Sequence, residues 1–190
     1  MSRRIDATGG GVQIGPVTVG LEWSRMSDRS DLSIDKLFLA EARDYIGIRE
    51  IGGDNRGPSV EFMQKLGEIT PGLPWCAAFV NTVAEIACSK KNIVSPLEKI
   101  NYQGYVQSYF LHAEAQGWLG APRPGHLFML YYPMKSRYAH IGIVDATLEG
   151  GLTTIEGNTN DDGSRNGIGV FQRYRHYSDR LVFADPWGSS

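Results

Sequence analysis

The chain has 190 residues, of which 42% are hydrophobic, and its 19 Lys and Arg against 21 Asp and Glu give a formal net charge of −2. This length and composition are typical of a globular protein with one domain and its own core. No block of Lys and Arg indicates a nucleic-acid partner, and no apolar run approaches the roughly 20 residues of a membrane span. We therefore expect neither nucleic-acid binding nor a membrane-spanning segment.

Residues 1–31 are rich in Gly, Ser, Asp and Arg and are predicted to form a polar tail or leader, with PVTVGLEW as a candidate short strand. Two arginines near the start are followed by glycines and polar residues, whereas a signal peptide needs a continuous apolar core. We therefore expect the protein to be made in the cytoplasm without a conventional signal peptide.

Residues 32–190 are expected to form a single domain, and its first half is helical. Apolar residues recur there at helical spacing, bounded by candidate caps and by Gly or Pro. The predicted helices are IDKLFLAEARDYIG after the N-cap candidate Ser33, PSVEFMQKLG from Pro58, the segment from Trp75 to Ser89, and YVQSYFLHAEAQG before Gly117.

The second half changes to short segments rich in β-branched and aromatic residues, separated by Gly, Pro, Asn and Asp. These segments are HLFMLYY, YAHIGIVDA, LTTIEGN, GVFQRYR and RLVFA. Helices followed by strands predict an α+β domain in which N-terminal helices pack on a C-terminal antiparallel β-sheet.

The two cysteines, Cys76 and Cys88, lie 12 residues apart in the third predicted helix. Their Cα atoms would be roughly 18 Å apart there, whereas a disulfide needs less than about 7 Å, so both are expected to be free thiols. Cys76 falls in the first turn, where helix N–H groups favour a thiolate, and Cys88 lies near the other end. Position alone leaves Cys76 as either a nucleophile or a packed core residue, and favours a structural role for Cys88.

A nucleophilic cysteine needs a base within hydrogen-bond reach and a polar group that orients the base. His140 at the start of HIGIVDA is the candidate base, and Gly142 on the same strand face leaves room beside it. The segment TLEGGL is turn-like, and a hairpin centred on Glu149 would put Asn158 opposite His140 and Glu156 diagonally from it. Either residue could hold the imidazole; the alternative is a polar rim at the end of a sheet.

The segments PWCAAFV, RYAHIGIV, TIEGNTN and GIGVFQRYR occur in this order, preceded by IGIREIGGDNRGPSVEFMQKLG. Together they resemble the CHAP family of cysteine, histidine-dependent amidohydrolases and peptidases, relatives of the NlpC-type cell-wall peptidases. The resemblance implies a papain-like fold with Cys76 as nucleophile, His140 as general base and acid, and Glu156 and Asn158 as orienting residues. No metal or other cofactor is expected, since the histidines and cysteines lack zinc-site spacing.

The same resemblance implies cleavage of peptidoglycan peptides through a cysteine thioester, by an endopeptidase or an N-acetylmuramoyl-L-alanine amidase. A protein made in a bacterial or phage-infected cytoplasm would then act at the cell wall or in the periplasm, and an immunity protein would be its partner if it is exported as a toxin. Two alternatives stay open: an amidase on a soluble small amide, and a non-catalytic module that binds the cell wall.

Three further residues are candidates for contact with substrate. Trp75 is expected to hold the helix start beside the cleft, with or without touching substrate, and Asn55 lies in a glycine-rich loop whose own structure is the simpler explanation. Arg173 and Arg175 alternate on one face of VFQRYR and could bind a peptide carboxylate or form a solvated strand edge. His126 stands in RPGH where many family members have an acid, as a surface substitution in a turn or as a group that reaches the cleft.

Overall fold

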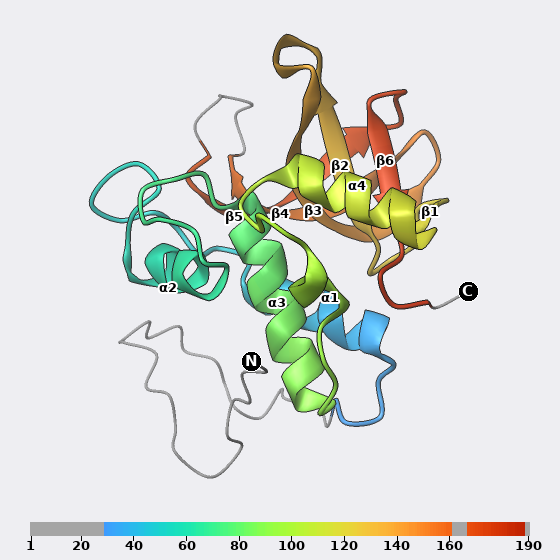
Figure 1. Ribbon diagram of the computed structural model, residues 1–190, viewed down its shortest axis with the longest axis horizontal. Coiled ribbons are helices and arrows are strands. Elements are labelled where there is room, and N and C mark those ends of the chain that lie inside the picture. Colours follow the sequence, from blue (N-terminus) through green and yellow to red (C-terminus); the bar gives the residue numbers. More distant parts are fainter. Residues whose placement is uncertain (1–28, 161–166, 189–190) are drawn as a thin grey trace.

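The computed structural model describes residues 29–160 and 167–188 (Figure 1). The predicted tail therefore lies almost entirely outside the described residues, as does its candidate strand PVTVGLEW. At the end of the tail, the guanidinium of Arg29 donates to Asp44 at 2.7 Å and to Glu41 at 3.1 Å, which ties this residue to the first helix.

Each segment with helical periodicity forms an α-helix. Ser33 is the N-cap residue of the first, although its side chain makes no capping hydrogen bond. Trp75 is the N-cap of the third, so Cys76 is the first helical residue. The helices are α1 (Ile34–Asp44), α2 (Pro58–Leu66), α3 (Cys76–Lys90) and α4 (Val106–Gln116), together with the short 3₁₀-helices η2 (Pro96–Lys99) and η3 (Pro133–Lys135).

The second half of the chain forms an antiparallel sheet with the strand order β1-β6-β2-β3-β4-β5. Five strands occupy the segments that the sequence pattern indicates, and β1 is a two-residue addition. The prediction of an α+β domain with an antiparallel sheet is thus confirmed. The strands are β1 (Leu119–Gly120), β2 (Leu127–Tyr132), β3 (Arg137–Leu148), β4 (Gly151–Thr159), β5 (Gly169–His176) and β6 (Leu181–Ala184).

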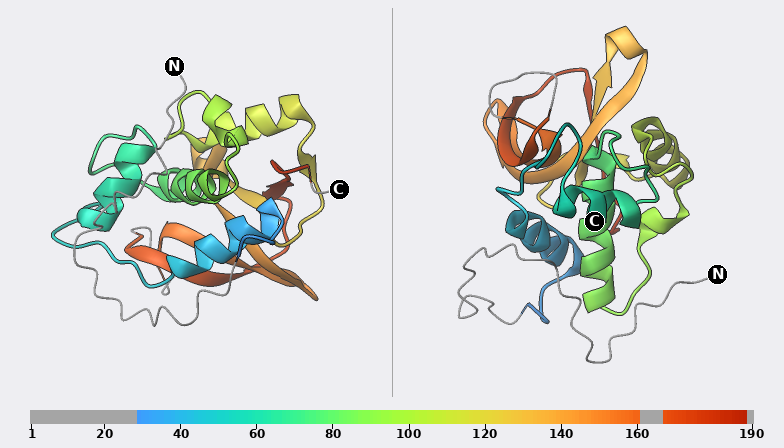
Figure 2. Two further views of the ribbon diagram at one scale, coloured as in Figure 1. Left: turned by 90° about the horizontal axis from the view of Figure 1, so that it is seen from below. Right: turned by 90° about the vertical axis from the view of Figure 1, so that its left-hand side faces the viewer.

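The main hydrophobic core lies around α3, which packs against α1, α2, β3 and β4. Figures 1 and 2 show α3 running through the middle of the molecule, with the sheet on one side of it. Alternation along β3 sends Ile141 and Ile143 into this core and Val144 into a smaller cluster with Phe128 on the other face. Both faces of β3 are therefore covered where His140 begins the motif HIGIVDA.

The β3–β4 hairpin has the predicted register in the pairs farther from its turn. Ile143 lies opposite Ile155 and Val144 opposite Thr154, and a bulge then shifts the pairs nearer the turn by one residue. Asp145 is the bulged residue, and its buried carboxylate accepts hydrogen bonds from Arg43 on α1 at 2.8 Å and from Thr153 at 3.2 Å. The bulge thus becomes the point at which α1 is tied to the sheet.

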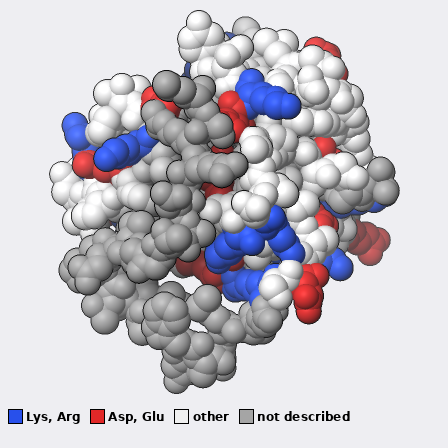
Figure 3. Space-filling model, turned by 60° about the horizontal axis from the view of Figure 1, so that its bottom comes forward, with Lys and Arg blue, Asp and Glu red and all other residues white. Residues whose placement is uncertain are grey.

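The exterior is mixed in charge on the face that Figure 3 shows, where acidic and basic side chains lie close to one another. Within residues 29–160 and 167–188, no helix combines the length and the apolar character that crossing a membrane requires.

Candidate active site

Cys76 is the first residue of α3 and follows the N-cap Trp75, which comes directly after the segment TPGLP. The prolines of that segment disfavour an earlier helix start. Cys76 is buried, with 6% of its surface exposed. Backbone amides of Ala77 and Ile141 donate to its sulfur. Position at the helix start and these two donors all favour the thiolate form.

His140 on β3 and Glu156 on β4 meet beside the thiol, with 2.7 Å between His140 Nε2 and Glu156 Oε2. Because Glu156 occupies Nε2, Nδ1 is the ring nitrogen left for the hydrogen bond with Cys76. Gly142 permits this approach, since a Cβ there would lie 2.6 Å from the ring of Phe128 and 3.1 Å from Cγ of Glu156. The room expected beside His140 is therefore filled by Glu156 and Phe128.

The thiol and the imidazole shift each other toward an ion pair. Burial opposes ionisation of Cys76, but the hydrogen bond and charge of His140, with the two backbone amides, outweigh it and lower the pKa of the thiol. Burial likewise opposes protonation of His140, but Cys76 and Glu156 raise its pKa to about 9. Between these two pKa values the site holds a thiolate beside an imidazolium.

Glu156 is wholly buried and ionised. Burial acts to raise the pKa of its carboxyl, but His140 and Arg175 hold that pKa well below its usual range. Arg175 on β5 donates from Nε to Oε1 and from Nη2 to Oε2, both at 2.5 Å, and the hydroxyl of Thr154 donates to Oε1 at 2.5 Å.

The sequence reasoning missed Arg175 as a site residue. The sequence predicts that Arg175 either binds a peptide carboxylate or lies on a solvated strand edge. The structure corrects both expectations, because the guanidinium is bound to Glu156. The available signal was Glu156 itself, since a carboxylate that orients a histidine in a buried site needs a cationic partner, and VFQRYR forms the neighbouring strand.

Cys88 differs from Cys76 in the direction in which its surroundings shift the thiol pKa. Both are free thiols, as predicted, and both are buried. Burial and the charge of Glu85 raise the pKa of Cys88 to about 11, so this thiol stays protonated at neutral pH. Cys88 therefore fits the structural role expected for it.

A second polar group holds the loop that precedes α3. Asn158 Oδ1 accepts the backbone N–H of Trp75 at 3.3 Å, and its Nδ2 donates to Asn55 Oδ1 at 3.0 Å. Glu50 accepts from the indole N–H of Trp75 at 2.8 Å and from the backbone N–H of Asn55 at 2.8 Å. We call Glu50, Asn55, Trp75 and Asn158 the helix-start network. The network fixes Trp75, the residue immediately before Cys76. Sequence reasoning did not identify Glu50 as part of it.

Of the two candidates for holding the imidazole, Glu156 makes the contact with His140 and Asn158 does not. The reason is that the β3–β4 pairing ends at Ile155, after which Asn158 takes a left-handed backbone with φ of 54° and turns toward α3. Trp75 is wholly buried, so it supports the helix start and offers no surface to a substrate.

The substrate contacts predicted for Asn55 and Arg173 remain predictions. Asn55 is half-buried at the edge of the helix-start network. Arg173 lies opposite Thr154, on the sheet face of Glu156, without contacting that carboxylate. Its Nη1 is buried and finds no hydrogen-bond partner among the described residues.

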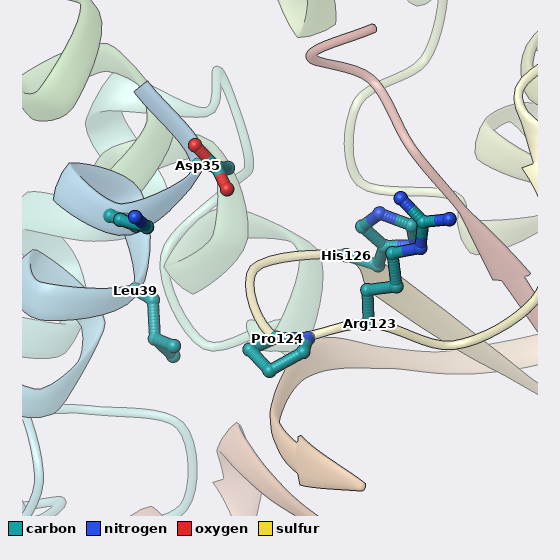
Figure 4. A pocket seen from close by; sticks show the side chains of 6 residues that line it. Asp35, Leu39, Arg123, Pro124 and His126 are labelled. Carbon is teal, nitrogen blue, oxygen red and sulfur yellow. The ribbon is translucent and has the colours of Figure 1, made fainter. Parts of the chain in front are cut away.

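His126 is neither a surface residue nor a group at the Cys76 site, which corrects both expectations for it. It is buried, with Nδ1 3.1 Å from the carbonyl oxygen of Ala121 and Nε2 3.7 Å from Oδ2 of Asp185. It lines a separate pocket of about 280 Å³ between α1 and the turn before β2, as Figure 4 shows. The other residues around this pocket are Asp35, Lys36, Leu39, Arg123 and Pro124.

The arrangement around Cys76 supplies a nucleophile, a proton donor and a fixed carboxylate that orients the donor. Nucleophilic attack on a carbonyl carbon requires these groups. Within the described ranges, no three His, Cys, Asp or Glu side chains are grouped so that they could hold a metal ion.

Comparisons with known proteins add little to this geometry. No protein-family model matches the chain, and no curated protein matches it. A solved structure described as "The crystal structure of Ly7917" is similar, with a TM-score of 0.41 and 15% sequence identity over 80% of this chain and 62% of that one. A likeness at this level identifies neither a family nor an activity.

Proposed function

We propose that the chain is a papain-like cysteine amidohydrolase or peptidase that hydrolyses amide bonds of peptidoglycan peptides. The observation that carries the catalytic part is the contact chain from Cys76 through His140 to the buried carboxylate of Glu156. A module that only binds the cell wall has no use for an ionised group in this position, and burying charge is costly. The substrate class rests on the resemblance of the surrounding motifs to the CHAP family.

In the proposed reaction the Cys76 thiolate attacks the scissile carbonyl carbon, and the backbone N–H of Cys76 at the start of α3 stabilises the oxyanion. The imidazolium of His140 gives its proton to the departing amine, which leaves a thioester on Cys76. Neutral His140 then takes a proton from water as that water attacks the thioester. Loss of the carboxylate product restores the ion pair, and Glu156 holds the ring through both steps.

The proposal places the protein at the bacterial cell wall or in the periplasm. Cleavage next to the lactyl group of the glycan and cleavage within stem or cross-bridge peptides use the same chemistry, so the bond cut depends on the shape of the access to Cys76. An immunity protein would accompany the chain if it is exported as a toxin.

Mass spectrometry of soluble products tests the proposal. Wild type, Cys76→Ala and the matched control Cys88→Ala are incubated with purified peptidoglycan of several chemotypes. We expect new fragments from wild type and Cys88→Ala only, and the fragment masses identify the amide bond that is cut.

Two results would contradict it. Fragments released by Cys76→Ala would remove the cysteine from the mechanism. No fragments from any wall, with Cys76 still labelled selectively by a thiol reagent, would exclude peptidoglycan as the substrate and favour a soluble amide.

A further inference from the structure

Glu156 is the most heavily bonded carboxylate of the described residues near the thiol. It has no exposed surface, and it contacts His140, Thr154 and both Nε and Nη2 of Arg175. His140 contacts Oε2 only, whereas Arg175 binds both oxygens through a two-bond fork. The fork is therefore the contact that fixes the plane of the carboxylate, and with it the direction of the bond to the imidazole.

Arg175 is itself held in place. Its guanidinium carbon lies 5.2 Å from the ring centre of Phe128, and that ring lies 6.0 Å from the ring of His140. The side chain of Arg175 has 22% of its surface exposed, so most of the guanidinium is removed from water. An arginine in such a position loses little freedom when it forms the fork, because its planar group is already oriented.

The charges at the site alternate in sign along the contacts, from thiolate to imidazolium to carboxylate to guanidinium. The other titratable groups that face them are Tyr132 at the end of β2 and Tyr109 in α4, and burial raises the pKa of both phenols. They stay neutral when the ion pair forms. The charged groups that set its electrostatics are thus Cys76, His140, Glu156 and Arg175.

We propose that Arg175 is a positioning residue of the active site, which fixes both oxygens of Glu156 and thereby sets the orientation and charge of His140 against the Cys76 thiol. This inference rests on the proposed function, because it assigns a role in the same reaction. Without Arg175 the carboxylate would turn about its remaining contacts, and one positive charge that supports the thiolate would be lost.

Arg173 provides a matched control on the same strand. It precedes Arg175 by two residues and lies on the same face of β5, yet it makes no contact with Glu156. A loss of charge or of packing at Arg173 should therefore leave the ion pair unchanged, whereas the same change at Arg175 should disturb it.

The test is the pH dependence of alkylation of Cys76 by iodoacetamide in the full chain, with peptide mass spectrometry to separate Cys76 from Cys88. In Arg175→Met we expect the midpoint of the rise in rate to move upward by about one pH unit, which is about tenfold in rate below the midpoint. Arg173→Met should keep the wild-type midpoint. Arg175→Lys keeps the charge without the fork, so it should restore the midpoint but lower kcat severalfold.

A folded Arg175→Met variant with the wild-type midpoint would overturn the inference. If Arg175→Met does not fold, Arg175→Lys serves as the test. A wild-type kcat in Arg175→Lys would overturn the role of the two-bond fork. The alkylation experiment contains no peptidoglycan, so it separates the two proposals. A wild-type midpoint near that of an ordinary thiol would contradict the ion pair itself, whereas an unshifted midpoint in Arg175→Met would contradict only the role of Arg175.

Discussion

At the scale of single residues, the reactivity of the site depends on how His140 is placed between two negative groups. The Cys76 thiolate and the Glu156 carboxylate both favour its protonated form, and together they overcome the cost of burying an imidazolium. In the proposed reaction, the proton that the departing amine needs would therefore be held in place before a substrate binds. Loss of that proton at high pH should stop hydrolysis while leaving the thiolate intact.

This gives a prediction for the pH dependence of two rates. The value of kcat/KM for hydrolysis should fall above neutrality with a midpoint near pH 9, because His140 loses its proton there. Alkylation of Cys76 should not fall over the same range, since the thiolate persists. Stopped assays at matched ionic strength measure both rates, and a parallel fall of the two would contradict the assignment of the alkaline limb to His140.

Gly142 offers a second prediction at this scale. In Gly142→Ala the new methyl group would lie 2.6 Å from Phe128, 2.8 Å from the carbonyl oxygen of Ile155 and 3.1 Å from Glu156. We expect a loss of about 1 to 3 kcal/mol in the free energy of unfolding, measured by urea denaturation, and slower alkylation of Cys76. Gly120→Ala is the control, because a Cβ there meets nothing within 4 Å. Equal stability of the two variants would show that the space beside Glu156 is not needed.

The site residues differ in how well the sequence predicts them. Cys76 has a local signal in the helix start, and His140 has one in the alternating segment that forms β3, although the strand begins earlier, at Arg137. The hairpin register brings Glu156 to the correct face. The choice between Glu156 and Asn158 depends on where strand pairing ends, which no local pattern encodes. Arg175 depends on a contact between strands, and only the requirement of a buried carboxylate for a cation points to it.

At the scale of elements, the position of the thiol depends on how the start of α3 is attached to β4. The helix-start network connects Asn158 and Trp75 through three hydrogen bonds that involve Glu50 or Asn55 at their other ends. The backbone bond from Trp75 to Asn158 lies one residue before Cys76. A loosened network should therefore displace the Cys76 thiol while leaving its pKa unchanged.

Asn158→Gly tests this attachment, because glycine keeps the left-handed backbone and removes only the side chain. We expect the free energy of unfolding to fall by about 1 kcal/mol, and kcat to fall about tenfold while KM changes little. Asn92→Gly is the control, since Asn92 has nearly the same backbone angle, with φ of 53°, and is exposed. A wild-type kcat in Asn158→Gly would contradict the positioning role.

The bulge in β3 offers a prediction on stability alone. Asp145→Ala removes a buried carboxylate that accepts from Arg43, Thr153 and Gln172, and should cost about 1 to 3 kcal/mol in the free energy of unfolding. Asp44→Ala, which breaks the exposed pair with Arg29, should cost less than about 1 kcal/mol. Chemical denaturation measures both. Slower alkylation of Cys76 in a folded Asp145→Ala protein would contradict a purely structural role.

Helices and strands were predictable because each has a long enough periodic pattern. The α3 stripe and the β3 alternation are both clear in the sequence, and so is the turn that joins β3 to β4. β1, η2 and η3 are too short to show a period. The bulge at Asp145 places a buried carboxylate against the half-exposed Arg43 of α1, a contact between distant segments that no local pattern encodes.

At the scale of the whole molecule, the sheet and the helices meet where α3 begins, and the site is built at that junction. α3 supplies the thiol, β3 the imidazole, β4 the carboxylate and β5 the guanidinium. Residues that act together are thus separated by many positions in the chain, and their distances depend on the fold being complete. The α+β class follows from the order of helical and strand-like segments, whereas this convergence follows from the antiparallel pairing of β3, β4 and β5.

The most direct test of the central claim is detection of the covalent intermediate. Wild-type protein is mixed with its peptidoglycan substrate, quenched in acid during turnover and digested for peptide mass spectrometry. We expect an acyl adduct on the peptide that contains Cys76, released by hydroxylamine and absent from Cys76→Ala. Undiminished product formation by Cys76→Ala, with no adduct on wild-type Cys76, would contradict the assignment of Cys76 as the nucleophile.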